Sequence, residues 1–132
     1  MKLVCDTNVL VAALVADGLC RDIVKRRLPK QALYTSRELL EELDSVLRVK
    51  FRADLIALPF LRIYRERAVV VEPVQLKQRV CRDPDDDVVL GTAKVAGADA
   101  ILTGDEDLLV LRRFEGIAIV SPRVFVESLD RK

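Results

Sequence analysis

Short apolar runs alternate along the chain with longer amphipathic stretches, a pattern typical of a parallel sheet covered by helices. The apolar runs predict five strands, at Lys2–Cys5, Ala32–Tyr34, Ala68–Val71, Ala100–Thr103 and Ile117–Val120. The amphipathic stretches predict helices at Val9–Val15, Arg21–Leu28, Thr35–Val49, Ala53–Arg67, from the Asp83–Pro84 turn to about Ala96, and Arg123–Leu129. We expect Gln75–Cys81 to be a short helix or a loop. Strands that alternate with helices indicate an α/β fold.

Local signals mark where several of these helices begin and end. Thr35 and Glu38 have the spacing of a capping box, which predicts a helix start. Gly97 is a typical helix stop, and Pro59 either starts or kinks the second half of its helix. The segment Leu55–Tyr64 is more apolar than one buried face requires, so it is either core or a contact surface for another chain.

Acidic residues follow two of the predicted strands. Asp6 comes directly after the first strand, and Gly104–Asp107 follows the fourth. Open α/β sheets place their ligand sites at the carboxyl ends of the strands, so we expect these acids to lie close together. Asp6 is equally suited to cap the next helix, and both interpretations are open at this point.

Two predicted helices each offer a further acid near the same edge of the sheet. At about 100° per residue, Glu42 falls at the margin of its helix's apolar stripe, although a solvated acid commonly occupies such a position. Asp86 shares a helix face with Val89, which makes it the inward-facing acid of its run. Its neighbours Asp85 and Asp87 are expected to cap the helix or to meet solvent.

The composition narrows the chemistry that these acids can serve. A chain of 132 residues, 51% hydrophobic and 33% charged, is enough for a single domain, residues 1–132. The absence of histidine excludes serine–histidine triads, imidazole acid–base chemistry and histidine-ligated zinc. Cys5, Cys20 and Cys81 share no short metal-type spacing, so we expect reduced thiols. Any catalysis must therefore depend on carboxylates.

Nothing in the sequence indicates a membrane segment or a signal peptide. The longest apolar run, Val9–Ala16, has about eight residues, whereas a spanning helix needs roughly 20. Asp6 interrupts the apolar segment that a signal peptide would carry. We therefore expect a cytoplasmic protein without membrane contact. The net charge of +1 favours no partner by itself, although acids committed to a metal would leave a basic surplus suited to a polyanion.

Acids at two strand ends, at a helix start and on a helix margin can converge on one pocket of such a fold. Oxygen ligands without nitrogen or thiolate select hard cations, here Mg²⁺ or Mn²⁺. The pocket could hold one or two ions, and a pair about 3.5–4 Å apart stabilises the charge that grows on a phosphate during in-line displacement. Phosphodiester hydrolysis is the reaction class that fits.

The acids lie in four motifs, VCDTNVLVAAL, TSRELLEELDSVL, RDPDDDVVLGTA and AILTGDEDLL. In this order and spacing the chain resembles, along its whole length, the PIN-domain ribonucleases, in particular the VapC-like toxin components of toxin–antitoxin pairs. The resemblance implies a PIN-like three-layer α/β fold, with a five-stranded parallel sheet in the order 3-2-1-4-5 flanked by helices. It also implies cleavage of single-stranded RNA that depends on Mg²⁺ or Mn²⁺.

The same resemblance implies roles for individual residues. The four acidic positions of the family, which are catalytic and bind the metal, match Asp6, Glu42, Asp86 and Asp105. The polar positions that support them, by orienting water or the carboxylates, match Asn8, Thr103 and Asp107. Asp87 is the alternative to Asp86 in the third motif. Family members commonly form homodimers and are silenced by an antitoxin protein, and Leu55–Tyr64 is a candidate for one of these contacts.

Two other functions fit parts of the pattern. An aspartate-nucleophile phosphatase or phosphotransferase also begins with a strand ending in aspartate, but its Asp-x-Asp start is absent because residue 8 is Asn. A non-catalytic PIN-like module that tethers RNA or a protein is the other alternative, and the presence of all four acids counts against it. No G-x-G-x-x-G follows the first strand, which argues against dinucleotide binding.

Overall fold

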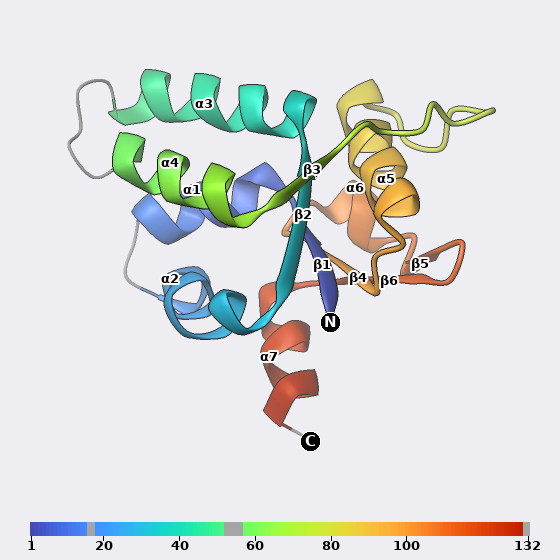
Figure 1. Cartoon of the computed structure of the whole chain (residues 1–132). Coiled ribbons are helices and arrows are strands. Elements are labelled where there is room, and N and C mark those ends of the chain that lie inside the picture. The colour runs from blue at the N-terminus through green and yellow to red at the C-terminus, as the bar shows by residue number, and fades with distance from the viewer. Residues whose placement is uncertain (16–17, 52–56, 131–132) are drawn as a thin grey trace.

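A computed structural model describes residues 1–15, 18–51 and 57–130 of the chain. In this part of the chain, six strands form one sheet in the order β3-β2-β1-β4-β6-β5, and helices cover both of its faces (Figure 1). The strands are β1 Lys2–Cys5, β2 Ala32–Ser36, β3 Val69–Val71, β4 Ala100–Leu102, β5 Arg113–Phe114 and β6 Ile117–Val120. Neighbours from β3 to β6 are parallel, and only the short β5 runs antiparallel to its partner.

The helices form layers on either side of this sheet. They are α1 Thr7–Val15, α2 Leu19–Asp22, the π-helix η1 Ile23–Arg27, the 3₁₀ helix η2 Leu28–Lys30, α3 Arg37–Phe51, α4 Ala57–Arg67, α5 Pro84–Ala96, α6 Glu106–Leu109 and α7 Pro122–Asp130. Figure 1 shows α1, α3 and α4 on one side of the sheet and α5 and α6 on the other. None of the described helices is long and apolar enough to cross a membrane.

Strand β1 lies in the middle of the sheet, and its residues point alternately into two cores. Leu3 and Cys5 pack with residues of α1, α3 and α7, whereas Val4 packs with residues of α5 and α6. All three side chains are buried. A strand that is covered on both faces needs an apolar residue at every position, which explains the uninterrupted apolar run that predicted it.

The parallel part of the sheet has the predicted strand order, but the prediction of five strands is wrong. The additional strand, β5, turns back onto β6 through Glu115 and Gly116, whose φ angles are 48° and 83°. Two consecutive residues with positive φ make the tight turn that suits a two-residue hairpin. Because β5 itself has only two residues, it has no hydrophobic period by which the sequence could reveal it.

Several helix boundaries differ from the predicted ones. The α3 cap is Ser36, whose Oγ accepts a hydrogen bond from the Leu39 N–H at 3.4 Å, so the expected capping box at Thr35 is wrong by one residue. Thr35 is instead the buried fourth residue of β2. The helix expected at Arg21–Leu28 is divided between α2, η1 and η2. Residues 75–81 form a loop, which is one of the two predicted alternatives.

The helix expected at Ala53–Arg67 is observed from Ala57, and its earlier residues 52–56 lie outside the described part of the chain. Pro59 lies in the first turn of α4, where its missing N–H breaks no intrahelical bond. Leu61 and Tyr64 are buried in the core, whereas 53% of the Ile63 surface is exposed. The apolar excess of this segment is therefore partly core and partly surface.

Candidate metal centre

The carboxyl ends of β1 and β4 bring the first two site residues together. Cys5 pairs in register with Leu102, so Asp6 and Thr103 leave the sheet side by side. The Asp6 N–H continues the ladder by donating to the Leu102 carbonyl at 2.9 Å. The Thr103 hydroxyl donates to Asp6 Oδ2 at 2.8 Å, and it accepts a hydrogen bond from the Asp105 N–H at 3.0 Å. Thr103 thus links the two strand-end acids.

Asn8 also links the residues that follow β1 to the residues that follow β4. Its side-chain amide lies 3.4 Å from Asp6 Oδ2 as a donor, and its Oδ1 accepts from the Gly104 N–H at 3.2 Å. The Thr7 N–H donates to Asp6 Oδ1 at 2.8 Å. Burial raises the pKa of Asp6, these bonds from Thr103 and Thr7 lower it, and the charge of Asp105 raises it further. Asp6 is consequently a buried, well-oriented carboxyl group.

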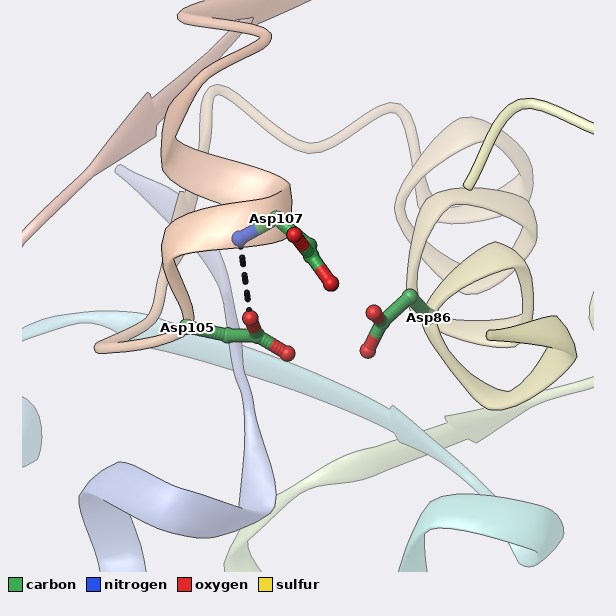
Figure 2. A group of neighbouring side chains, drawn as sticks. All are labelled: Asp86, Asp105 and Asp107. Carbon is green, nitrogen blue, oxygen red and sulfur yellow. Dashed lines mark hydrogen bonds between the residues drawn. The ribbon is translucent and has the colours of Figure 1, made fainter. Parts of the chain in front are cut away.

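Two further carboxylates, those of Asp86 and Asp107, converge with that of Asp105 next to this pair of strand ends. One carboxylate oxygen from each of Asp86, Asp105 and Asp107 lies within 4.8 Å of the other two (Figure 2). Asp105 precedes α6, and its Oδ1 accepts the Asp107 N–H at 2.9 Å, which aligns both side chains on one side of the loop. Asp86 reaches them from the first turn of α5.

The electrostatics of this cluster favour a bound cation. Asp86 is 8% exposed, and its burial together with the negative charge of Asp105 raises its pKa to about 7. Ligands of Mg²⁺ lie at about 2.0–2.1 Å from the ion, so opposite ligands are about 4 Å apart, comparable with the spacing of these oxygens. The three carboxylates fit a hard divalent cation because they supply only oxygen ligands.

Glu42 lies beside this cluster, not inside it. It is half-buried on α3, and burial raises its pKa, while a hydrogen bond with the Thr7 side chain lowers the value and the charge of Asp6 raises it again. A groove of about 400 Å³ runs past Glu42 between α1 and α3 and is lined at its far end by Lys50. A larger apolar cavity, about 450 Å³, lies away from the acids between η2 and α4.

The structure separates residues of the third motif that the sequence left as alternatives. Asp86 faces Asp105, whereas Asp87 accepts hydrogen bonds from the N–H groups of Val80 and Cys81 at 3.1 and 2.8 Å. Asp83 caps α5 by accepting the Asp85 N–H at 2.9 Å. The geometry therefore assigns Asp87 to the preceding loop and Asp86 to the acidic cluster.

Two features of the site differ from the sequence-based expectation. Asp107, expected only to support the other acids, is itself one of the three clustered carboxylates. Arg82, which the sequence analysis did not single out, contacts Asp107 through Nη2 and Oδ1 at 2.9 Å. The one signal that could have drawn attention to it is a basic residue directly before the acidic helix start.

This fold, with acids gathered at the carboxyl edge of a parallel sheet, belongs to a known class. The model of the PIN domain family matches residues 2–107, a range that contains all the acids described above, and the chain belongs to this family. A solved structure of VapBC-1 from nontypeable Haemophilus influenzae is similar, with a TM-score of 0.62 and 14% sequence identity over 93% of this chain and 99% of that chain. Comparison with curated protein sequences gave no match.

Proposed function

We propose that the protein is a divalent-metal-dependent endoribonuclease that hydrolyses phosphodiester bonds of single-stranded RNA. The observation that carries this proposal is the convergence of Asp86, Asp105 and Asp107 next to the buried Asp6. Membership of the PIN domain family supports it, because PIN domains are generally metal-dependent nucleases. A phosphodiester is the substrate for which clustered carboxylates and a divalent ion are suited.

The clustered aspartates would hold one or two Mg²⁺ or Mn²⁺ ions, with Asp6 and Glu42 beside them. When bound, such an ion supplies an activated water and neutralises the charge that develops on the phosphate. Asn8 and Thr103 keep Asp6 in one orientation through their hydrogen bonds. In this proposal Glu42, whose pKa is raised by burial, exchanges a proton beside the groove.

The groove beside Glu42 suits a single-stranded substrate. Its walls include Val11 and Val46, against which a base can pack, and Lys50, which can meet a phosphate. A nucleotide in this groove would lie beside Glu42 and Asn8, and Asn8 in turn contacts Asp6. Duplex RNA buries its bases by pairing, so it could not place one there.

We further propose that the protein acts as the toxin of a toxin–antitoxin pair and forms a homodimer. The structural likeness to VapBC-1 supports the first part of this proposal. The half-exposed Ile63 on α4 is a candidate for a contact with an antitoxin or with a second copy. Size-exclusion chromatography with light scattering measures the oligomeric state of the purified chain.

The test of the proposed activity uses end-labelled single-stranded RNA and the same RNA annealed to its complement. We expect the wild-type protein to cut the single strand with Mn²⁺ and to stop when EDTA is added. Asp6→Asn should abolish cutting and leave the thermal stability equal or higher, because it removes a buried charge but keeps a hydrogen-bond acceptor for Thr103. Asp44→Asn, in the middle of α3 and paired with Arg48 outside the acidic cluster, is the matched control and should cut normally.

Two results would reject the proposal in different ways. Equal cutting by Asp6→Asn and the wild type would mean that the activity belongs to a contaminant or to another site. Mn²⁺ binding by calorimetry without cleavage of any RNA would favour the non-catalytic PIN-like module instead.

A further inference from the structure

Arg82 places a positive charge at the edge of the acidic cluster. Its Nη2 lies 2.9 Å from Asp107 Oδ1, and no other ion pair of the described residues involves Asp86, Asp105 or Asp107. The Arg82 side chain is 87% exposed, so most of its five N–H groups face solvent. An exposed guanidinium beside a cluster of carboxylates is available to a ligand that arrives from solvent.

The backbone under Arg82 is held in place by side chains on both sides. The N–H groups of Val80 and Cys81 donate to the two oxygens of Asp87, at 3.1 and 2.8 Å. The Arg82 carbonyl accepts a hydrogen bond from Arg79 Nη2 at 2.8 Å. These bonds fix the backbone of the segment relative to the start of α5, so the exposed Arg82 side chain extends from a defined position.

The negative charge of the site repels a phosphate, so phosphate binding requires a positively charged group such as the Arg82 guanidinium. Asp6, Asp86, Asp105 and Asp107 gather negative charge where the proposed function requires a phosphate to bind. A divalent ion neutralises part of it, but a phosphate that approaches the carboxylates is still repelled by those that remain unpaired. An arginine offers parallel N–H groups that match two phosphate oxygens.

We propose that Arg82 is a substrate-binding residue, which holds Asp107 in the free protein and donates to the phosphate group at the cleavage point when RNA binds. This inference rests on the proposed function and names one contact by which the site recognises RNA. An exposed ion pair contributes little to stability, so the exchange of Asp107 for a phosphate has a small cost. Asp107 would then be free to hold a metal ion together with the other clustered carboxylates.

The experiment compares Arg82→Gln and Arg82→Lys with Arg48→Gln. The control removes the same charge from an ion pair of equal N···O distance, Arg48 with Asp44, on α3. The probe is a fluorescein-labelled single-stranded RNA of mixed sequence, and its binding is measured by anisotropy in Ca²⁺ at several salt concentrations. Cleavage of the same RNA is then measured with Mn²⁺, and Mn²⁺ binding without RNA by calorimetry.

We expect Arg82→Gln to raise the Kd for RNA about tenfold and to reduce the salt slope of the affinity by about 0.7, the change for one lost contact to a single strand. Its kcat/KM should fall at least about tenfold, with Arg82→Lys intermediate because it keeps the charge but not the paired donors. Mn²⁺ affinity should be unchanged or higher, since a competing cation is gone. Arg48→Gln should match the wild type in all three measurements.

The outcomes separate this inference from the proposed function. If the wild type binds and cuts RNA and Arg82→Gln shows the same Kd and salt slope, the role of Arg82 is wrong and the nuclease proposal stands. Loss of Mn²⁺ binding by Arg82→Gln would also overturn the inference, because it would mean that the arginine supports the acids and not the substrate. If the wild type neither binds nor cuts RNA, both proposals are wrong.

Discussion

The Asp86 carboxylate is expected to destabilise the metal-free protein, and Asp86→Asn tests this. Asp86 is 8% exposed and faces Asp105 and Asp107 with carboxylate oxygens within 4.8 Å. Burial and the charge of Asp105 raise its pKa from 3.8 to about 7. A carboxyl group whose pKa is higher in the folded than in the unfolded protein resists ionisation in the fold. Its contribution to stability therefore falls as the pH rises from about 4 to about 7.

The size of the effect follows from the pKa difference. A rise of about three units corresponds to at most about 4 kcal/mol at neutral pH, because each unit is worth about 1.36 kcal/mol. Asp105 and Asp107 are partly exposed, so water screens part of the repulsion. We therefore expect that Asp86→Asn, which keeps the shape but not the charge, stabilises the metal-free protein at pH 7.5 by about 1–2 kcal/mol. For a domain of this size that corresponds to a rise in Tm of about 4–8 °C.

The assay is thermal unfolding in EDTA, followed by circular dichroism for the wild type and Asp86→Asn between pH 4 and pH 7.5. The difference in Tm between the two proteins should be small near pH 4 and should grow with pH. Addition of Mn²⁺ at pH 7.5 should raise the Tm of the wild type and have little effect on the variant, since binding to the folded state stabilises it. A Tm of Asp86→Asn at or below that of the wild type in EDTA at pH 7.5 would refute this reasoning.

Two further substitutions test the geometry of the site. Asp107→Asn should weaken Mn²⁺ binding at least about tenfold in calorimetry, because a neutral amide replaces one of three clustered carboxylates; an unchanged affinity would exclude Asp107 from the metal ligands. Thr103→Val should lower the free energy of unfolding in urea by about 1–3 kcal/mol, because the lost hydroxyl donates to Asp6 and accepts from the Asp105 N–H. Thr103→Ser keeps the hydroxyl and should remain close to the wild type, and equal destabilisation by both variants would contradict the assignment of the effect to the hydrogen bonds of the hydroxyl.

The hydrophobic pattern along the chain was sufficient to predict the helices and strands that pack against the core along their whole length. After the exposed Lys2, the residues Leu3–Cys5 are all apolar because both faces of β1 are buried, so the pattern depends only on these residues themselves. The helix wheel selected Asp86 over Asp87 because Val89 and Leu90 lie on the same face and enter the core. The turn signal of Asp83–Pro84 at the start of α5 and its Gly97 stop are likewise local, and both agree with the structure, although the cap is Asp83 and not Asp85 or Asp87.

The sequence analysis missed or misplaced elements whose conformation depends on pairing with another segment of the chain. The strand β5 exists because Arg113 and Phe114 pair with β6 across a tight turn, and the two residues alone carry no pattern. Thr35 and Ser36 are chemically equivalent as helix caps. Ser36 became the cap because pairing with β3 extends β2 to this residue.

The order of apolar and acidic residues in this chain was enough to predict a parallel α/β sheet with carboxylates at its carboxyl edge. Which carboxylates meet depends on segments far apart in sequence. Asp86 and Asp105 come together because α5 packs against the sheet. Arg82 reaches Asp107 because Asp87 binds the backbone N–H of Cys81, the residue directly before Arg82, and so holds this loop in place. Arg82 lies in a loop and Asp107 in the short helix α6, where no hydrophobic period indicates the direction of a side chain. The entry of Asp107 into the cluster and its pairing with Arg82 therefore became visible only in the folded chain.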